Sequence, residues 1–424
     1  MSIGQSGEGD TAFRRRRTWV LVAATLGMAG SYSPIAVSSF GFFVVPLNAE
    51  FGWGRGDISF AVTILSYTVA LLSPFVGALV DRVGVRRVLL PSLCAFGLTL
   101  VALALMSGPL ALFLGLYFLL AVSGAGVTSA VYSQVIVRWY DRSRGTALGI
   151  GLSGIGIGLV VLPPLIQQIV ERFGWRGGYL FLAAVVVLVV FPVCLVWLKE
   201  RPWVGKDSSK AAPASGLSLT QAARQPRFWF MSFSFFLLGI FTTGFSAHMV
   251  PLLADLGMAG AMIGLAVSVK GFTVIVGRLG VGWLLDRADP RVVVIVSLVG
   301  PIACLIMLMM GGSPWLVFMA AALAGFGVGA EQDFMCYFTG KYFGVKNYAR
   351  IYGVMYAMLI FGSGTGPLIM GYCQQFTGDY TLGLGVLAAL TTLAIVPLMF
   401  LGRYPTNEEV DLAALPEPTV SSGV

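Results

Sequence analysis

Charged residues are scarce in this chain of 424 residues: Asp, Glu, Lys and Arg make up 11% of it, whereas hydrophobic residues make up 57%. Soluble domains carry roughly 25% charged residues. The composition therefore excludes an ordinary soluble protein and indicates an integral membrane protein. The 54 glycines agree with that class, because glycine lets membrane helices pack closely.

The sequence also lacks the residues that catalytic and metal centres need. It has one histidine, which excludes a His-based metal cluster, and its five cysteines lie in apolar segments with no CxxC spacing. No HExxH or GxSxG motif appears, so no enzyme site is visible, and the lack of GxxxxGK[ST] argues against ATP-driven pumping. We therefore expect neither an enzyme nor a bound cofactor or metal.

Long apolar runs are what the chain does have, and twelve of them are long enough to cross a bilayer. They cover 18–46, 57–80, 88–107, 109–137, 145–171, 177–199, 228–254, 261–285, 292–311, 314–340, 350–376 and 380–402. A polar stretch separates the first six from the last six. We expect an all-α membrane protein whose parts are the following: a tail 1–17, a six-helix bundle 18–199, a linker 200–227, a second six-helix bundle 228–402 and a tail 403–424.

The placement of the basic residues predicts the orientation. If both tails are cytoplasmic, 22 of the 27 Lys and Arg fall in segments on that side and three, Arg55, Arg172 and Arg176, fall on the other. This is a strong positive-inside bias. We expect a multi-pass protein of the inner (plasma) membrane with both termini cytoplasmic, working as a monomer. The formal charge of +8 is then a topology signal, and nucleic acid is not expected as a partner.

Two short motifs recur in the second half of the chain. GALVDR at 77–82 returns as GWLLDR at 282–287, and GAGV at 124–127 returns as GFGV at 325–328. Two halves related in this parallel sense suit alternating access around a central site.

The longer segment GALVDRVGVRR at 77–87 fills every characteristic position of the loop between helices 2 and 3 of the major facilitator superfamily. With twelve runs and a central linker, the sequence resembles that superfamily over nearly its whole length. FGWGRGDIS at 51–59, RWYDRSRG at 138–145 and Arg278 followed by Gly282 resemble its monocarboxylate and oxalate:formate porter branch. In that branch the arginine of helix 8 engages the substrate carboxylate, which implies this role for Arg278.

The sequence departs from the branch at three places. Val274 stands where animal members carry an aspartate one turn before the arginine, and neither 18–46 nor 352–376 contains the lysine that some members have there. The substrate and coupling residues of relatives are therefore not transferable as a set.

Two cations lie inside the apolar run 261–285. A cation at bilayer depth costs roughly 2.5–3.5 kcal/mol on the lenient insertion scale, so it normally faces protein or a wet cavity. Lys270 and Arg278 lie about 80° apart around the helix and about 12 Å apart along it, so both can border one cavity. We predict that Arg278 binds a carboxylate and that Lys270 assists. A structural ion pair is the open alternative for each.

Helix 10 supplies two carboxylates, Glu331 and Asp333, which face nearly opposite ways because they are two residues apart. We predict that one of these carboxylates takes up a proton when the anion binds its cationic partner. The sequence leaves open which of the two it is. His248 is a further proton-coupling candidate, with a hydrogen-bonded packing role as its alternative.

The remaining candidates are weaker. Tyr132, Gln134 and Tyr356 are proposed substrate contacts, with bonding to a neighbouring helix as the alternative. The superfamily resemblance implies a gating role for five residues of the inner loops: Asp81, Arg82, Arg86, Arg87 and Arg142.

Together these features predict a secondary active transporter that takes up a small organic anion, a monocarboxylate or aromatic carboxylate, with a proton. Anion exchange or export, and a sensor that binds ligand without moving it, stay open as alternatives. So does a structural charge network in a carrier for neutral solutes.

Overall fold

The computed structural model describes residues 5–140, 144–199, 216–285, 287–311, 313–344 and 347–401. At 5–14, 144–146, 282, 290, 291, 332, 333 and 349 it describes the backbone alone. The elements are α1 Gln5–Ala29, η1 Ser33–Ser38, α2 Gly41–Phe51, α3 Arg55–Val83, α4 Val85–Ala104, α5 Leu110–Ala125, α6 Ser129–Trp139, α7 Arg144–Ala184, η2 Val185–Val190, α8 Phe191–Trp197, α9 Leu219–Ala223, α10 Pro226–Asp255, α11 Gly260–Leu285, α12 Pro290–Met310, α13 Pro314–Phe343, α14 Tyr348–Thr377 and α15 Thr381–Met399. The all-helical expectation is confirmed.

Eleven segments within the described residues are long and apolar enough to cross a membrane. One of them, Ala147–Trp197, has 51 residues, about twice what a bilayer needs. Its helix α7 is broken at Gly174, where φ is 70° and ψ is −179°, a conformation that glycine adopts without strain. The fifth and sixth predicted spans lie on either side of this break. The count of twelve stays a prediction.

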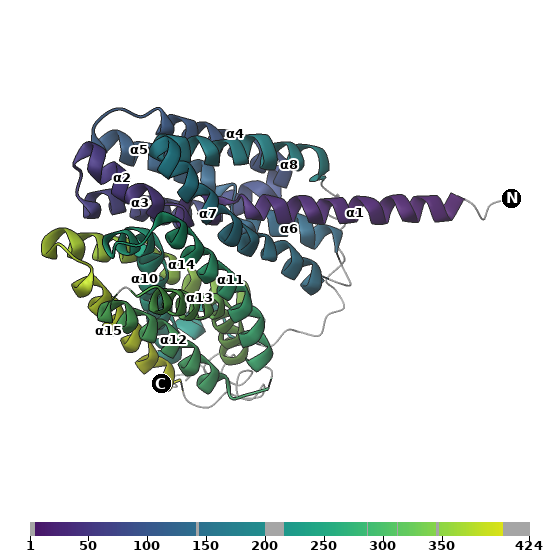
Figure 1. Cartoon of the computed structure of the whole chain (residues 1–424). Helices are drawn as coiled ribbons and strands as arrows, with labels where there is room; N and C mark the ends of the chain where they lie inside the picture. Colours follow the sequence, from purple (N-terminus) through teal and green to yellow (C-terminus); the bar gives the residue numbers. More distant parts are fainter. Residues whose placement is uncertain are drawn as a thin grey trace, which may run out of the picture.

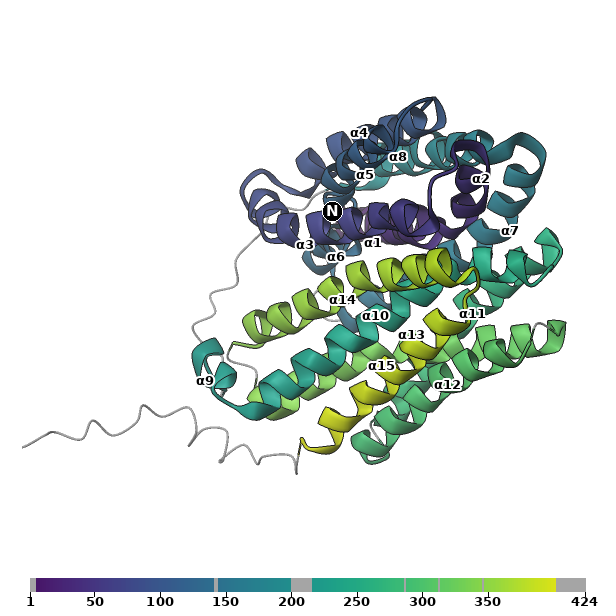
Figure 2. The same ribbon diagram turned by 90° about the vertical axis from the view of Figure 1, so that its left-hand side faces the viewer.

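The helices form two groups in space (Figures 1 and 2). Elements up to α8 make the first group and elements from α10 onward make the second, here called the first half and the second half. The halves meet chiefly where α3 packs on α14 and where α7 packs on α11. The predicted domain limits stay predictions, because most of the linker and the C-terminal tail lie outside the described residues.

Close packing of α10 against α14 depends on glycine. A Cβ atom at Gly362 would lie 1.9 Å from the Phe236 carbonyl oxygen, and one at Gly366 would lie 2.1 Å from the Ile240 carbonyl oxygen. Only a residue without a side chain allows the two backbones to approach this closely. The glycine-rich stretch 362–366 is therefore a helix contact.

The backbone of the first half is irregular where the turn η1 contacts the junction of α5 and α6. Tyr32 precedes the π-helical turn η1, and its backbone N–H donates to the carbonyl oxygen of Val127 at 3.3 Å, between α5 and α6. Irregular backbone at membrane depth is tolerated where protein or a cavity covers it. Tyr32 therefore faces the interior at a point of irregular backbone.

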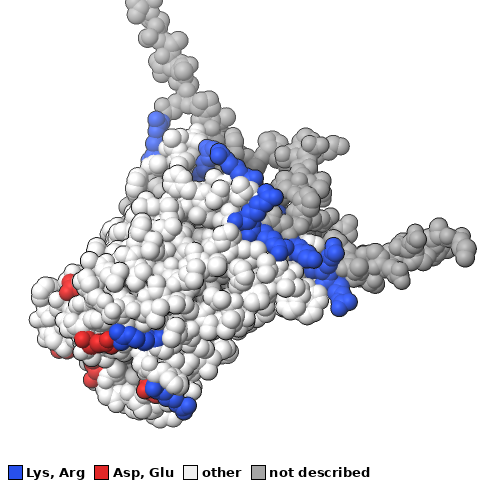
Figure 3. All heavy atoms as spheres, turned by 90° about the horizontal axis from the view of Figure 1, so that it is seen from above, with Lys and Arg blue, Asp and Glu red and all other residues white. Residues whose placement is uncertain are grey.

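We call the end of the molecule where α3 begins the Arg55 end and the opposite one the Asp81 end. In Figure 3 the described Lys and Arg gather mostly on the side where α1 begins, and the visible Asp and Glu lie toward the other side. The charge asymmetry that the sequence predicts is thus visible on this face of the molecule.

Candidate functional site

Two hydroxyl side chains lie on one face of α10. Thr242 and Ser246 are half-buried, whereas the preceding residues Phe241 and Phe245 are buried. Side chains at positions i and i+4 of a helix lie on the same face. The two hydroxyls therefore lie on the same face of α10, one helical turn apart.

A buried carboxylate reaches the first of these hydroxyls. Glu331 on α13 is 6% exposed, and its Oε2 accepts a hydrogen bond of 2.6 Å from Thr242 Oγ1. It also lies within electrostatic range of Arg278, which is half-buried on α11. A buried carboxylate needs such partners, because an unpaired charge in an apolar interior costs several kcal/mol. Glu331 and Arg278 are therefore close enough to interact electrostatically.

A lysine reaches the second hydroxyl. The half-buried Lys270 on α11 donates from Nζ to Ser246 Oγ, and Ser246 in turn donates to the Thr242 carbonyl oxygen. The Lys270 Nζ lies 5.6 Å from the centre of the Phe245 ring, within the range of a cation–π interaction. Lys270, Ser246, Thr242 and Glu331 thus form a continuous polar line along one face of α10, which we call the α10 line.

The first half contributes two polar groups opposite this line. The Tyr32 hydroxyl lies within side-chain hydrogen-bonding range of Ser66 on α3 and near Tyr356 on α14. Tyr356 in turn lies within electrostatic range of Glu331 and is 37% exposed. A polar path therefore runs from the first half through Tyr356 to the carboxylate of the second half.

A different polar network joins the halves at the Arg55 end. Arg55 on α3 donates to both carboxylate oxygens of Asp255 on α10, at 2.6 and 2.9 Å, and to the Tyr380 hydroxyl at 3.2 Å. Such a bidentate pair is among the stronger ion pairs. Arg55 thereby connects the first half to two elements of the second.

His248 extends this network into the interior, where it is fully buried. Its Nε2 lies 3.0 Å from the Pro367 carbonyl oxygen, which can only accept, so Nε2 carries the proton. Its Nδ1 then accepts from the Tyr380 hydroxyl at 3.0 Å. Burial raises the pKa of Tyr380 to about 12, so this hydroxyl stays protonated. Both ring nitrogens of a neutral His248 are satisfied.

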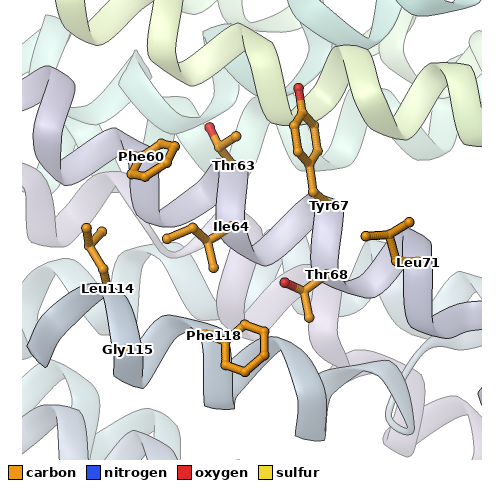
Figure 4. A pocket seen from close by; sticks show the side chains of 9 residues that line it. All are labelled: Phe60, Thr63, Ile64, Tyr67, Thr68, Leu71, Leu114, Gly115 and Phe118. Carbon is orange, nitrogen blue, oxygen red and sulfur yellow. The ribbon is translucent and has the colours of Figure 1, made fainter. Parts of the chain in front are cut away.

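A hollow of about 680 Å³ lies elsewhere, on the outer surface between α3 and α5 (Figure 4). It is lined by nine residues, most of them apolar: Phe60, Thr63, Ile64, Tyr67, Thr68, Leu71, Leu114, Gly115 and Phe118. Tyr67 points away from it toward α14, where its hydroxyl bonds Thr365 at 2.9 Å. The hollow is separate from the α10 line and holds none of the predicted site residues.

Comparison with known proteins decides the family. Residues 26–330 match the family described as Major Facilitator Superfamily, and a second match covers 233–421. These matches extend over most of the sequence. The chain belongs to the Major Facilitator Superfamily. It is therefore a multi-pass membrane transporter and not an enzyme.

Several relatives within the superfamily are named as monocarboxylate transporters. Monocarboxylate transporter 11 of Mus musculus is 28% identical over 86% of this chain and 82% of its own length. Monocarboxylate transporter 13 of Bos taurus is 27% identical over 88% of each. The uncharacterized MFS-type transporter YhjX of Escherichia coli is 24% identical over 83% of this chain and 86% of its own. The chain thus resembles the monocarboxylate branch.

Solved structures show the same fold. A bacterial homologue of the human lysosomal transporter Spinster, in an inward-facing and unoccupied conformation, aligns with a TM-score of 0.73 at 15% identity, covering 95% of this chain and 99% of that one. The nucleoside transporter NupG aligns with a TM-score of 0.75 at 13% identity, covering 92% and 100%. At these identities the likeness concerns the fold alone, and it confirms the major facilitator fold.

Four of the predicted site residues of this superfamily member come together: Lys270, Arg278, Glu331 and Tyr356. Three others do not join them. Tyr132 is fully buried inside the first half beside the Cys194 thiol, Gln134 is half-buried on α6, and His248 lies at the Arg55 end. Asp333 lies in α13, but its side chain is outside the described residues.

The predicted gating residues lie at the Asp81 end. Asp81, Arg82 and Arg87 are exposed. Arg86 on α4 donates to the Leu195 carbonyl oxygen of α8 at 2.5 Å, which is a contact within the first half. Arg142 lies outside the described residues. Their gating role remains a prediction.

Four residues of the site were not found from the sequence: Tyr32, Ser66, Thr242 and Ser246. A usable signal existed for two of them, since Thr242 and Ser246 are small polar residues spaced by four in an otherwise apolar helix. No local signal marked Tyr32 or Ser66, because their place in the site depends on how the halves pack.

Proposed function

We propose that this transporter moves a small organic anion, a monocarboxylate or aromatic carboxylate, into the cell together with a proton. The observation that carries the proposal is the buried Glu331 within electrostatic range of the intramembrane Arg278. The names of the monocarboxylate relatives support the substrate class.

Arg278 is the proposed anion-binding group, because its planar guanidinium matches a carboxylate with two parallel hydrogen bonds. A substrate carboxylate at Arg278 competes with Glu331 for the same positive charge. Glu331 then keeps only its bond to Thr242, and a proton on Glu331 removes the uncompensated buried charge. Each anion would thus enter with one proton.

Alternating access requires the halves to part at one end and close at the other. In the structure the Arg55 end carries the Arg55–Asp255 ion pair and the Ser59–His248 hydrogen bond, both of which join the halves. We propose that this end faces outward and is closed here, and that the basic Asp81 end and both termini face the cytoplasm of an inner membrane. Asp81, Arg82, Arg86, Arg87 and Arg142 are the proposed gate of that inner end.

Uptake of radiolabelled carboxylates into proteoliposomes tests the proposal. Wild type should accumulate label when the outside is made acidic, and Arg278→Gln should reduce uptake about tenfold or more, the value of a charge-assisted hydrogen bond. Glu331→Gln should abolish the response to the pH gradient while retaining exchange of labelled for unlabelled anion. Glu171→Gln is the matched control, because this carboxylate is exposed on α7 and bonds only Gln167 among the described residues.

Two results would contradict the proposal. If uptake follows a counter-anion gradient and ignores pH, the protein is an exchanger and Glu331 does not couple. If neutral compounds move at the same rate in wild type and in a folded Arg278→Gln variant, the arginine is structural and the substrate class is wrong.

A further inference from the structure

The hollow on the outer surface lies between α3 and α5, two helices of segments long and apolar enough to cross a membrane (Figure 4). None of the nine residues that line it, all of them described, is charged. Three of them are large, apolar and exposed: Phe60 at 42%, Leu71 at 62% and Phe118 at 49%. Exposed apolar surface of this kind marks a membrane contact or a ligand groove. The hollow therefore suits hydrocarbon and offers no charge to a polar ligand.

Gly115 on α5 keeps the hollow open. It is exposed, and no atom lies within 4 Å of the position that its Cβ atom would take. Leu114 and Phe118 supply the rest of the α5 wall. The space is thus left free by the protein and is filled by the molecules that surround it. At membrane depth these molecules are lipids, because the hydrocarbon core of a bilayer holds no water.

The hollow follows α3 over a distance that matches one acyl chain. Its lining runs from Phe60 to Leu71, eleven positions along the helix, which is about 16 Å at 1.5 Å per residue. One leaflet provides half of the hydrocarbon core of a bilayer, or about 15 Å. Because Phe60 lies five residues after Arg55, near the start of α3, the hollow belongs to the leaflet on the side of the Arg55 end.

Two residues of the lining also hold the halves together. Thr63 donates from Oγ1 to the Gly364 carbonyl oxygen of α14 at 2.6 Å, and the Tyr67 hydroxyl bonds Thr365 at 2.9 Å. The Tyr67 ring meets Phe361 of α14 edge to face, with ring centres 5.2 Å apart. A gap beside a side chain forfeits dispersion contacts. A chain bound in the hollow would therefore restrain Thr63 and Tyr67 where they bond α14.

We propose that the hollow binds one acyl chain of a membrane lipid from the leaflet on the Arg55 side, and that the bound chain favours closure of the Arg55 end. The second effect follows because Thr63 and Tyr67 make their bonds to α14 across the contact between halves. It is reciprocal, since closure raises the affinity for the chain by the same factor. The binding site is independent of the proposed function, whereas the effect on closure rests on the closed state proposed above.

Photochemical labelling tests the site. The purified protein is placed in nanodiscs of a short-chain phosphatidylcholine, with a trace of long-chain phosphatidylcholine that carries a diazirine in the middle of one chain. Mass spectrometry should find the label on the α3 and α5 peptides that line the hollow, and excess unlabelled long-chain lipid should displace it. Gly115→Leu places a side chain in the hollow and should reduce the labelling to the level that remains with excess competitor.

Gly149→Leu is the matched control. Gly149 is likewise an exposed glycine of a first-half helix with nothing within 4 Å of its Cβ position, but it does not line the hollow. This variant should keep the labelling of wild type. Both substitutions should leave the protein folded, because leucine is a better helix former than glycine. If Gly115→Leu does not fold, the competition experiment on wild type decides the question alone.

Distances between spin labels on the two halves at the Arg55 end report the effect on closure. More long-chain lipid should raise the ratio of closed to open molecules about fivefold in wild type, the lower end of typical coupling between two sites. Gly115→Leu should respond little, and a change of bilayer thickness acts on both proteins alike. Thr63→Val removes the bond to Gly364 with little change of shape. It should bind the chain as wild type does but respond less.

Three outcomes would contradict the proposal. Labelling that spreads evenly over the exposed helices and resists competition would mean ordinary lipid contact, and the site would be wrong. Labelling that falls as protein density rises at constant lipid would mean that a second copy of the chain covers the hollow. Displaceable labelling with unchanged distances would overturn the effect on closure. None of these readouts needs transport, so their failure is distinct from that of the proposed function.

Discussion

The molecule contains two polar networks that are built from the same kinds of side chain but differ in how fully their groups are paired. At the Arg55 end, the guanidinium of Arg55 pairs with Asp255 and both nitrogens of His248 have partners. Along the α10 line, Lys270 contacts uncharged groups among the described residues, and Glu331 lies within electrostatic range of Arg278. The first network is satisfied within the protein, whereas we propose that a ligand completes the second.

The comparison shows that burial of a charged or titratable side chain does not by itself mark a binding site. Buried polar groups are normally hydrogen-bonded within the protein, and His248 meets that rule fully. The better criterion is remaining capacity to bind. By this criterion Lys270 stays a candidate binding residue and His248 does not, although both lie inside helices long and apolar enough to cross a membrane.

The largest effect is expected from disturbing packing within one half. Gly362→Ala places a Cβ atom 1.9 Å from the Phe236 carbonyl oxygen, which forces α10 and α14 apart. Overpacking of this kind typically costs 1–3 kcal/mol and occasionally more. We expect a lower melting temperature of the purified protein in detergent, or loss of folded protein.

Gly353→Ala is the control on the same helix, because nothing lies within 4 Å of its Cβ position. Alanine is a better helix former than glycine by about 1 kcal/mol, so this variant should melt at the same temperature or higher. Equal melting of the two variants would show that the α10–α14 contact does not hold the second half together.

A smaller effect is expected from breaking the contact between halves. Asp255→Asn removes the charge that Arg55 pairs with, and a lost charge-assisted bond costs about 1.5–3 kcal/mol. Because this bond joins the two halves at the end that we propose is closed, the variant should shift the population toward opening there. Distances between spin labels placed on the two halves at this end report the shift.

Glu50→Gln is the matched control for that experiment. Glu50 also pairs with an arginine, Arg176, at 2.7 Å, and its exposure is close to that of Asp255, at 40% against 36%. Both partners of this pair belong to the first half, so the label distances should not change. A similar shift in both variants would mean that the Arg55 network is not specific to the closed state.

Much of the fold could be predicted from the sequence, because apolar run length and basic-residue placement follow directly from the bilayer. The sequence also marks Arg278, Lys270 and Glu331 as candidate site residues, since a charged side chain inside an apolar helix is costly unless it faces protein or a wet cavity. For His248 the sequence left proton coupling and a hydrogen-bonded packing role both open, because its partners Ser59, Tyr380 and Pro367 come from three other parts of the chain. Sequence spacing carries no information about such contacts.

The smallest effect is expected from removing the hydroxyl of one of two tyrosines on α14. Tyr356 and Tyr372 both lie on α14 and are 37% and 36% exposed. Tyr356 lies within electrostatic range of Glu331 and Tyr32. Tyr372 instead donates a hydrogen bond of 3.2 Å to Asp57 at the Arg55 end. Loss of one hydroxyl contact costs about 0.5–1.5 kcal/mol. Tyr356→Phe should therefore raise the half-saturation concentration of the transported carboxylate roughly threefold, and Tyr372→Phe should leave it unchanged. If Tyr372→Phe weakens binding as much as Tyr356→Phe, substrate affinity depends on closure of the Arg55 end, and the two networks act together on the ligand.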